Sequence, residues 1–368
     1  MAEAIRWSLT GEQEAYGRAV HDFLSEQLPE ATTRELMESR DGYRPETWRR
    51  FCDSLGVAGT TVASRYDGSG GELSDLLVVF EQLGRHVVGL PALATLGLAL
   101  PVLNEVGDDA VRQRLLPALV SGSLTATLVA PGGSERVRAT RHSGRYLLDG
   151  YVSQVVDGHT ANLLLVAAVA EDGLGLFAVE RGSAGLGAEA LPTFDLTRKL
   201  ASVHLHGCAA ERLDAPGTAE ELLARAHAIA RTCVAAEQLG GASACLETAV
   251  DYARRRYQFG RPIGSYQAIK HRCADVLLLV ESARTAVRYA GWVADHRPDE
   301  LPIAAATAKA VASEAYLTAA STHIQIHGGI GFTWEHGAHL HLKRAKSMQG
   351  FLGDPIACRR DIALALKL

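Results

Sequence analysis

The order of segment types along the chain most constrains its fold: helix-like sequence comes first, strand-like sequence follows, and helix-like sequence returns. Residues 11–118 carry apolar side chains at the 3.6-residue spacing of helices. Residues 125–208 contain short runs rich in Val and Leu that turn residues separate, a pattern typical of strands. Ala-rich helical sequence resumes near Ala219 and continues almost to the end. Because helices and strands do not alternate as βαβ units, the order argues against a doubly wound sheet and predicts an α+β protein.

Local patterns predict individual elements within this order. Apolar periodicity predicts a helix over residues 12–28, and a second, buried helix over residues 75–84 that Gly84 would end. The dipeptide Asp149-Gly150, between two apolar runs, predicts a hairpin turn. The changes in sequence character predict three domains: an N-terminal helical domain (1–120), a middle β domain (121–215) and a C-terminal helical bundle (216–368).

Composition excludes several classes of function. Of the 368 residues, 47% are hydrophobic and 21% charged, and the net charge is −5, so no concentrated basic face points to a nucleic-acid partner. The first residues, 1–7, show no signal-peptide pattern. The longest apolar run, residues 87–103, is interrupted by glycines and prolines and is unsuited to a membrane span. We therefore expect a cytoplasmic protein with no membrane span.

The cysteines and histidines do not predict a metal centre. No two of the six cysteines have CxxC spacing. His323 and His327 are four residues apart and could share one helix face as metal ligands, but no carboxylate near them in the sequence completes a ligand set. We therefore expect no metal.

Two segments far apart in the sequence, residues 256–264 and 325–332, each stand where a helical pattern breaks. Arg256 opens the first segment, and a guanidinium donates two parallel, charge-assisted hydrogen bonds to a pyrophosphate. The second segment contains Gly328 and Gly329, which allow backbone N–H groups to approach an anionic ligand where a Cβ would collide. Together the segments predict two pieces of one dinucleotide-binding surface.

These motifs resemble those of the acyl-CoA dehydrogenase family, and the resemblance extends over nearly the whole chain, including residues 80–85 and 115–119. It implies an N-terminal helical domain, a β-barrel-like middle domain and a C-terminal four-helix bundle. It also implies a tetramer built from dimers, with an FAD lying across each dimer interface. The implied reaction is the α,β-dehydrogenation of an acyl-CoA thioester, in which a carboxylate removes the α-proton while a hydride leaves the β-carbon for the flavin.

By this resemblance, the chain keeps the half of the site that one subunit lends to its neighbour's FAD. Arg256 would bind the pyrophosphate and Phe259 would pack on the cofactor. The implied FAD contacts are Arg256, Gln258, Phe259, Ile263, Gln267, Gln325, Gly328 and Gly329. Taken alone, Phe259 could instead be a core aromatic at a helix end, and the two glycines could form a plain turn.

The half that receives substrate and flavin departs from the family pattern. Leu352 replaces the usual catalytic Glu, and the alternative base position, on the first helix of the C-terminal bundle, is Ala230. Neither side chain can take a proton. The family's Trp-Ile-Thr-Asn segment reads Gln-Val-Val-Asp at residues 154–157, so Val156 offers the flavin edge only its backbone groups. The loop at residues 129–135 also lacks the family's usual polar side chains.

Glu237 is the main remaining carboxylate that could serve as the base. It lies seven residues after Ala230, on roughly the same helix face but about 10 Å further along. Burial in an Ala-rich helix could raise its pKa and make it a base. The alternative, which we favour, is a helix-packing hydrogen bond or an intersubunit contact. Asp354 is a still weaker candidate base, since a turn residue before Pro355 is its natural role.

The combination predicts a half-site subunit. It would pair with a homologous chain in an α2β2 heterotetramer, lend its FAD contacts to that partner, and leave base and acyl pocket to it. Paired subunits of this kind resemble those that act on acyl-CoA chains attached to bulky rings, including steroid side chains. Two alternatives remain open. One is a self-sufficient homo-oligomeric flavoenzyme, either a dehydrogenase with Glu237 as base or another flavin enzyme such as an oxygenase. The other is an interaction protein that keeps the fold for assembly only.

Overall fold

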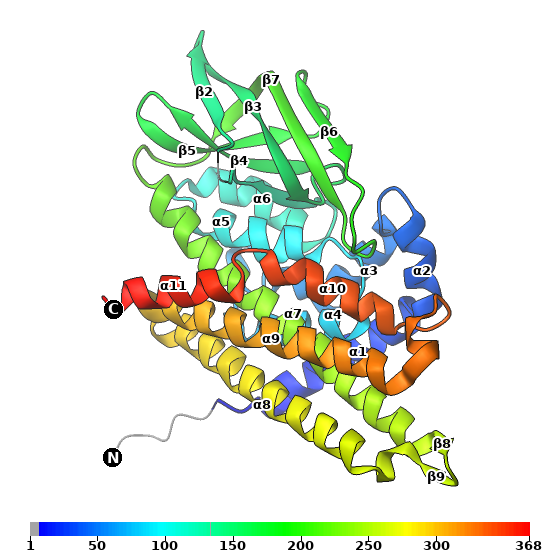
Figure 1. Ribbon diagram of the computed structural model, residues 1–368. Helices are drawn as coiled ribbons and strands as arrows, with labels where there is room; N and C mark the ends of the chain where they lie inside the picture. Colours follow the sequence, from blue (N-terminus) through cyan, green and yellow to red (C-terminus); the bar gives the residue numbers. More distant parts are fainter. Residues whose placement is uncertain (1–6, 133) are drawn as a thin grey trace. The chain divides into compact units, whose positions relative to one another are not determined.

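The computed structural model describes residues 7–132 and 134–368 (Figure 1). The main helices are α1 (Gly11–Gln27), α2 (Glu30–Glu38), α3 (Pro45–Leu55), α4 (Leu73–His86), η3 (Leu93–Ala99), α5 (Leu100–Glu105), α6 (Asp109–Val120), α7 (Ala219–Arg255), α8 (Gln267–His296), α9 (Leu301–His327), α10 (Ala338–Gly350) and α11 (Pro355–Ala365). The strands are β1 (Ala126–Val129), β2 (Val137–His142), β3 (Arg145–Val156), β4 (Leu163–Ala170), β5 (Gly173–Glu180), β6 (Leu186–Ala190), β7 (Leu200–Arg212), β8 (Tyr257–Gln258) and β9 (Arg261–Pro262). The predicted helical, β-rich, helical order is confirmed. Residues 1–6, which belong to the start considered for a signal peptide, and Gly133 lie outside the described residues.

Contacts within the chain divide it into two compact units. The first consists of Met1–Thr33, Leu73–Val88 and Arg231–Leu368, and the second of Arg34–Glu72 and Gly89–Ala230. Each unit has its own core, so each is described by itself. The division into three domains at residues 120 and 215 stays a prediction.

The strands of the second unit form one sheet that closes on itself. Their order is β1-β4-β2-β3-β7-β5, β6 adds to β7, and β5 pairs back with β4. Among the described residues, the parallel pairs of this sheet are those of β4 with β1 and β2. Side chains of alternating positions, such as Leu148 and Val152 of β3, meet Phe177 and Val203 in the interior. The closed pairing matches the predicted barrel-like middle domain.

The hairpin between β2 and β3 turns at Ser143-Gly144, earlier than the predicted Asp149-Gly150. Ser143 and Gly144 have φ of 50° and 82°, the left-handed pair that a two-residue hairpin turn requires. Gly150 instead lies inside β3, at an irregularity in the pairing with β7. There a Cβ would lie 2.6 Å from the backbone oxygen of Arg136. The prediction of a turn at Asp149-Gly150 was wrong because this glycine serves a close strand contact.

The first unit is a helical bundle centred on α9. Figure 1 shows α9 between α8 and α10, and α11 also packs on α9. Ser313 of α9 donates a hydrogen bond to Oε1 of Gln238 in α7 (3.1 Å). The Tyr316 hydroxyl of α9 bonds to Nδ1 of His341 in α10 (3.0 Å). The later part of α7 therefore joins α8, α9 and α10 in a four-helix arrangement.

Helices α4 and α7 cross at a reciprocal pair of glycines. A Cβ at Gly84 would lie 1.8 Å from the backbone oxygen of Glu237, and a Cβ at Gly240 would lie 1.8 Å from that of Glu81. α4 continues to His86, so the expectation that Gly84 ends this helix was wrong. A glycine inside a helix destabilises it by about 1 kcal/mol relative to alanine, but here it allows two backbones to meet.

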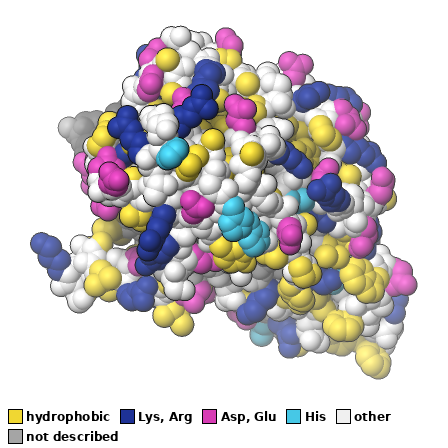
Figure 2. Space-filling view, turned by 90° about the horizontal axis from the view of Figure 1, so that it is seen from above, with side chains coloured by type: hydrophobic (Ala, Val, Ile, Leu, Met, Phe, Trp, Pro, Cys, Tyr) yellow, Lys and Arg dark blue, Asp and Glu magenta, His cyan; other side chains and the backbone are white. Residues whose placement is uncertain are grey.

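Charged side chains of both signs are interspersed over the face drawn in Figure 2, and no large surface of one sign occupies that face. Among the helices of residues 7–132 and 134–368, none combines the length and apolar character that a membrane crossing requires.

Candidate functional site

The first predicted motif forms a hairpin just beyond the end of α7. β8 pairs with β9, and the turn between them is Phe259-Gly260, with φ of 54° and 77°. Left-handed backbone is unusual for a bulky residue. The Phe259 side chain is nevertheless 92% exposed, so the alternative that it is a core aromatic was wrong. A strained turn that holds an aromatic ring in solvent indicates a surface made for an external partner.

Arg256 is the cation of this hairpin that is available to a ligand. Its exposed guanidinium makes no ion pair or hydrogen bond with any other residue that the structure describes. Its neighbours are engaged: Arg255 pairs with Asp251 (3.1 Å), and Arg261 lies over the Tyr266 ring at 4.0 Å from the centroid. An unpaired guanidinium can bind a phosphate without first breaking another contact.

The second predicted motif begins where α9 ends. The chain turns at Gly328, with φ of 64°, into the short helix η6 (Gly328–Phe332). A Cβ built at Gly328 or Gly329 meets nothing within 4 Å, so the backbone there is open to a ligand. Gln325 is exposed on the last turn of α9, and Phe332 is 82% exposed just beyond it.

The two motifs lie side by side within the first unit. Ile326 of α9 packs in one cluster with Ala253 of α7, and Ile263, which follows the hairpin, packs against that cluster. The rings of Tyr252 and His327 stack with centroids 4.1 Å apart. Helix packing therefore joins segments that are about seventy residues apart in the sequence, as a shared binding surface requires.

All but one of the predicted FAD contacts lie on this surface with exposed side chains or backbone. Gln258 belongs to the hairpin, Gln267 begins α8, and both are exposed. Ile263 is half-buried and holds the hairpin to the bundle. An unpaired cation, an exposed ring and an open glycine backbone match a pyrophosphate joined to flat ring systems, so these residues fit one edge of an FAD.

The two usual base positions carry no carboxylate and adjoin a buried arginine. Leu352 has a left-handed backbone, with φ of 56°, and its carbonyl accepts a hydrogen bond from Nε of Arg231 (2.7 Å). Arg231 also pairs with Asp361 (2.7 Å) and directly follows Ala230 in α7. A positive charge thus stands beside both positions where the family pattern has its base.

Glu237 is held in a buried ion pair. Its carboxylate accepts from Nη1 of Arg344, and the two side chains are 2% and 1% exposed. Arg344 also donates to the backbone oxygen of Val88 (3.1 Å). This geometry favours a packing role for Glu237. Asp354 caps α11, because its side chain accepts from the N–H of Ala357 (2.7 Å).

The end of β3 offers little to a flavin edge. Val156 is 3% exposed, and its carbonyl accepts a hydrogen bond from Oγ1 of Thr127 (2.6 Å). Gln154 and Asp157 on either side have left-handed backbones, with φ of 57° and 51°. The N–H of Asp157 donates to the backbone oxygen of Lys199 (3.0 Å). Backbone groups around Val156 are therefore already used inside the second unit.

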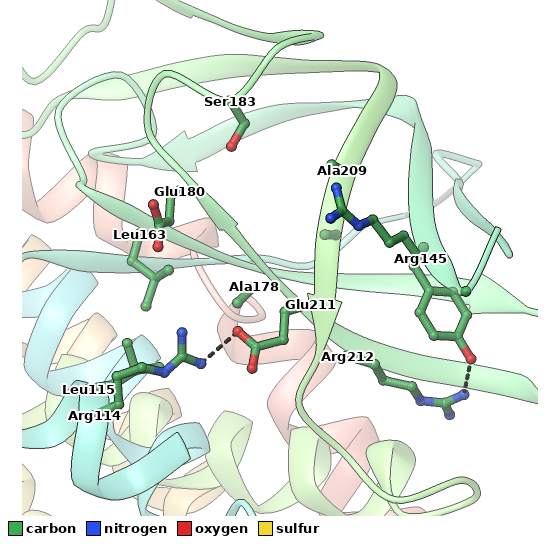
Figure 3. A pocket seen from close by; sticks show the side chains of 13 residues that line it. Arg114, Leu115, Arg145, Leu163, Ala178, Glu180, Ser183, Ala209, Glu211 and Arg212 are labelled. Atoms are coloured by element: carbon green, nitrogen blue, oxygen red, sulfur yellow. Dashed lines mark hydrogen bonds and ion pairs between the residues drawn. The ribbon is translucent and has the colours of Figure 1, made fainter. Parts of the chain in front are cut away.

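An arginine-lined cavity of about 520 Å³ in the second unit was not predicted (Figure 3). Two of its three lining arginines are paired: Arg114 pairs with Glu211 (2.6 Å), and Arg212 pairs with Asp172 (2.7 Å) and Asp214 (3.1 Å), while Arg145 is the third. Carboxylates of Glu180 and Glu211 also line the cavity, so its charge is mixed and does not single out an anionic substrate.

A histidine cluster at the end of α9 was also missed. His323 and His327 share a helix face as their spacing predicted, and the structure adds His336 to them. His336 follows the irregular segment after α9, so no spacing rule connects it with the other two.

The comparisons with known families agree with the motifs. Residues 10–123 match the model of the acyl-CoA dehydrogenase N-terminal domain, and residues 222–366 match that of the C-terminal domain. The chain is 36% identical over 327 residues to acyl-CoA dehydrogenase IpdE2 of Mycolicibacterium smegmatis, covering 89% of each protein.

Solved structures share the fold along nearly the full length. The ChsE4–ChsE5 complex from Mycobacterium tuberculosis matches with a TM-score of 0.91 and 27% identity, over 99% of each chain. A variant of the Tcur3481–Tcur3483 steroid ACAD matches with a TM-score of 0.88 and 28% identity, over 97% of this chain and 98% of that one.

Proposed function

The chain belongs to the acyl-CoA dehydrogenase family, whose members bind FAD, and from that premise we propose that it is the half-site subunit of a cytoplasmic α2β2 acyl-CoA dehydrogenase. In this role it lends residues of the β8–β9 hairpin and of the α9–η6 junction to the FAD of a homologous catalytic chain. The observation that carries the proposal is Phe259, which is 92% exposed in a left-handed turn. Exposure of this ring in strained backbone is unfavourable for an isolated chain and is explained when a partner and its cofactor cover it.

The residues of the hairpin and of the α9–η6 junction would each contact a different part of the FAD. When bound, FAD would supply the hydride acceptor for the dehydrogenation of the acyl thioester. Arg256 would bind the pyrophosphate through charge-assisted hydrogen bonds, and Phe259 would exclude water from the cofactor. The backbone N–H of Gly329 would meet the remaining anionic oxygens, where the absent Cβ leaves space. Gly328, whose own N–H donates to the carbonyls of Ile324 and Gln325, would line the site beside it.

The base and the acyl pocket would come from the partner. Leu352 and Ala230 cannot take the α-proton, and Arg231 beside them would compete for any carboxylate placed there. The Glu237 carboxylate is committed to Arg344 in the interior of the bundle. These contacts support a chain that positions a cofactor and does not itself remove a proton.

The expected substrate is an acyl-CoA with a bulky group such as a steroid side chain. Support comes from the steroid ACAD and the two-chain ChsE4–ChsE5 complex among the similar structures. Both are named as pairs of chains, as the half-site proposal requires.

The test is the FAD stoichiometry and native mass of this chain, purified alone and together with a homologous chain encoded beside it. We expect no flavin on the chain alone, and two FAD per four subunits in the complex. A stable tetramer of this chain alone with one FAD per subunit would refute the proposal and favour the self-sufficient enzyme.

A pair of arginine variants sharpens this test. Arg256→Ala is expected to lower the FAD affinity of the complex at least about tenfold, because a charge-assisted hydrogen bond contributes about 1.5–3 kcal/mol. Arg254→Ala, on an exposed arginine of the same helix end, is the matched control and is expected to keep full FAD content. Equal FAD content in both variants would contradict the assigned role of Arg256.

A further inference from the structure

Three histidines converge where α9 ends and the chain approaches α10. His323 and His327 lie one turn apart on α9, and His336 lies just before α10. One nitrogen of each ring falls within 4.8 Å of one nitrogen of each of the others. The ring centroids are 4.6 Å apart for His323 and His327, 4.4 Å for His327 and His336, and 5.7 Å for His323 and His336. All three belong to the first unit.

His323 is the buried member that points to a missing ligand. It is 3% exposed, and neither of its ring nitrogens has a hydrogen-bond partner among the described residues. Burying an imidazole with no partner for its N–H or its lone pair costs about 1–3 kcal/mol per group.

His327 is oriented in the way that metal-binding histidines are. Its Nδ1 lies 2.8 Å from the backbone oxygen of His323, which accepts the Nδ1 proton. The remaining nitrogen, Nε2, then carries the lone pair. Metal-ligating histidines almost always donate their second ring nitrogen to such an acceptor, which determines the tautomer before the metal arrives.

His336 supplies the third ring from a segment outside regular helix. Its Nδ1 accepts a hydrogen bond from the N–H of Ala338 (3.1 Å). Ligation by this ring requires it to turn or to release that bond. Three imidazoles on a tetrahedral Zn²⁺ at about 2.0–2.1 Å place their nitrogens about 3.3–3.4 Å apart. The ring nitrogens, which lie within 4.8 Å of one another, must therefore come closer together to bind one zinc ion. His336 is the half-buried member of the three, so it is the ring that can move.

A cavity of about 300 Å³ beside the cluster supplies the rest of a coordination sphere. His323 and His336 line it together with two carboxylates, Glu30 and Glu335. The Glu30 carboxylate lies close to the segment of His336. A Cβ built at Gly337, the residue after His336, would lie 2.6 Å from Oε2 of Glu30. A carboxylate or a water can thus occupy a fourth position and offset the charge of a divalent cation. Arg85 also lines the cavity, and its ion pair with Glu247 neutralises it.

We propose that His323, His327 and His336 form a zinc site that joins the end of α9 to the start of α10. Neutral imidazoles suit Zn²⁺, and with a carboxylate as the fourth ligand this partly buried site suits a structural role. The ligands bracket η6, which contains Gly328 and Gly329. The metal would therefore hold this glycine segment in one conformation. The site stands independently of the proposed function, because it rests on the histidines alone.

The experiment measures metal on the full, untagged chain. We expect about one zinc per chain by elemental analysis after purification. After chelation, Co²⁺ should give the intense visible absorption of four-coordinate cobalt, and added Zn²⁺ should displace it. His336→Gln is the main variant, because His336 is half-buried and its replacement leaves the bundle core intact. His142→Gln, on an exposed histidine of β2, is the matched control.

The expected result is a loss of zinc affinity of at least about 100-fold in His336→Gln, since even outer-shell partners of a metal are worth about 10- to 100-fold. His142→Gln should bind as the unaltered chain does. His327→Gln should show the same loss, which guards against a folding defect in one variant. No zinc after purification together with no four-coordinate cobalt spectrum would overturn the site. Equal zinc affinity in His336→Gln and His142→Gln would also overturn the site, because it would show that zinc binds adventitiously elsewhere. A chain that binds zinc but lends nothing to a partner's FAD would refute only the proposed function.

Discussion

The crossing of α4 and α7 makes a sharp prediction about a single methyl group. Gly84→Ala places a Cβ 1.8 Å from the backbone oxygen of Glu237 and 2.7 Å from its carbonyl carbon. A Cβ is not tolerated within 3.0 Å of another heavy atom, so the two helices must separate by at least about 1.2 Å. No side-chain rotation can relieve the contact, because both colliding groups belong to helix backbone.

Two opposing effects set the magnitude. Replacing a helical glycine with alanine favours the helix by about 1 kcal/mol. Overpacking a tight contact typically costs about 1–3 kcal/mol, and a collision with rigid backbone belongs at the upper end of that range. A separation of this size also weakens the reciprocal contact of Gly240 with Glu81. We expect Gly84→Ala to lower the free energy of unfolding by about 2 kcal/mol in total.

Urea unfolding of the full chain, followed by circular dichroism, measures this difference. Gly350→Ala is the matched control: Gly350 ends α10, does not have a left-handed backbone, and has nothing within 4 Å of its Cβ position. It should be neutral or stabilising. The double variant Gly84→Ala with Gly240→Ala should lose less than the sum of the two single variants, because one separation relieves both collisions. A Gly84→Ala chain as stable as the unaltered chain would refute the close crossing.

Two further predictions concern buried polar groups of the same unit. Glu237→Gln removes the carboxylate that pairs with Arg344 in the interior, so it should lower the free energy of unfolding by about 3–5 kcal/mol. In the same urea assay, adding Arg344→Met should recover part of that loss. Burial, with a smaller contribution from His21, lowers the pKa of His86 to about 4. His86 of the unfolded chain therefore binds a proton below about pH 6.5, whereas His86 of the folded chain binds one only below about pH 4. As the pH is lowered from about 6.5 to about 4, the free energy of unfolding should fall by up to about 1.4 kcal/mol per pH unit. His86→Gln should flatten this slope in metal-free protein, and an unchanged slope would show that other groups dominate.

Sequence patterns predicted the order of elements well because each pattern has one dominant physical cause. The period of apolar residues over 12–28 reflects one buried helix face, and α1 (Gly11–Gln27) confirms it. The two dinucleotide segments were expected to meet, and Ile326 and Ile263 do pack on a common cluster. The residue types at the two helix breaks carried this prediction, and the segments meet because both follow helices of the same bundle.

The predictions made from glycines were wrong at Gly84 and Gly150, because glycine serves several structural purposes. Gly84 was expected to end a helix, but its position at a crossing depends on α7, far away in the sequence. Gly144 and Gly150 both follow a polar residue, and strand pairing shows that Gly144 belongs to the turn. A glycine has no side chain to signal its surroundings, so its role follows from whatever packs against it.

The sequence predicts only part of the histidine cluster. The spacing of His323 and His327 places them on one helix face, but no carboxylate lies near them in the sequence to complete a ligand set. Glu30 belongs to α2 and His336 to the segment before α10, yet both reach the same cavity. A site assembled from separate elements leaves no fixed spacing in the chain.

The β8–β9 hairpin with the α9–η6 junction, and the base positions Leu352 and Ala230, support the same proposed half-site role. Arg231 binds the carbonyl of Leu352 and pairs with Asp361, so the segment where the family has its base keeps an ordered conformation without a carboxylate. The hairpin at Phe259, in contrast, keeps a conformation that is costly in isolation. A chain that had lost all function would be free to relax this strain, for example by placing glycine at position 259. The strained, exposed aromatic beside an unpaired Arg256 therefore supports the proposed role of this hairpin in binding a cofactor.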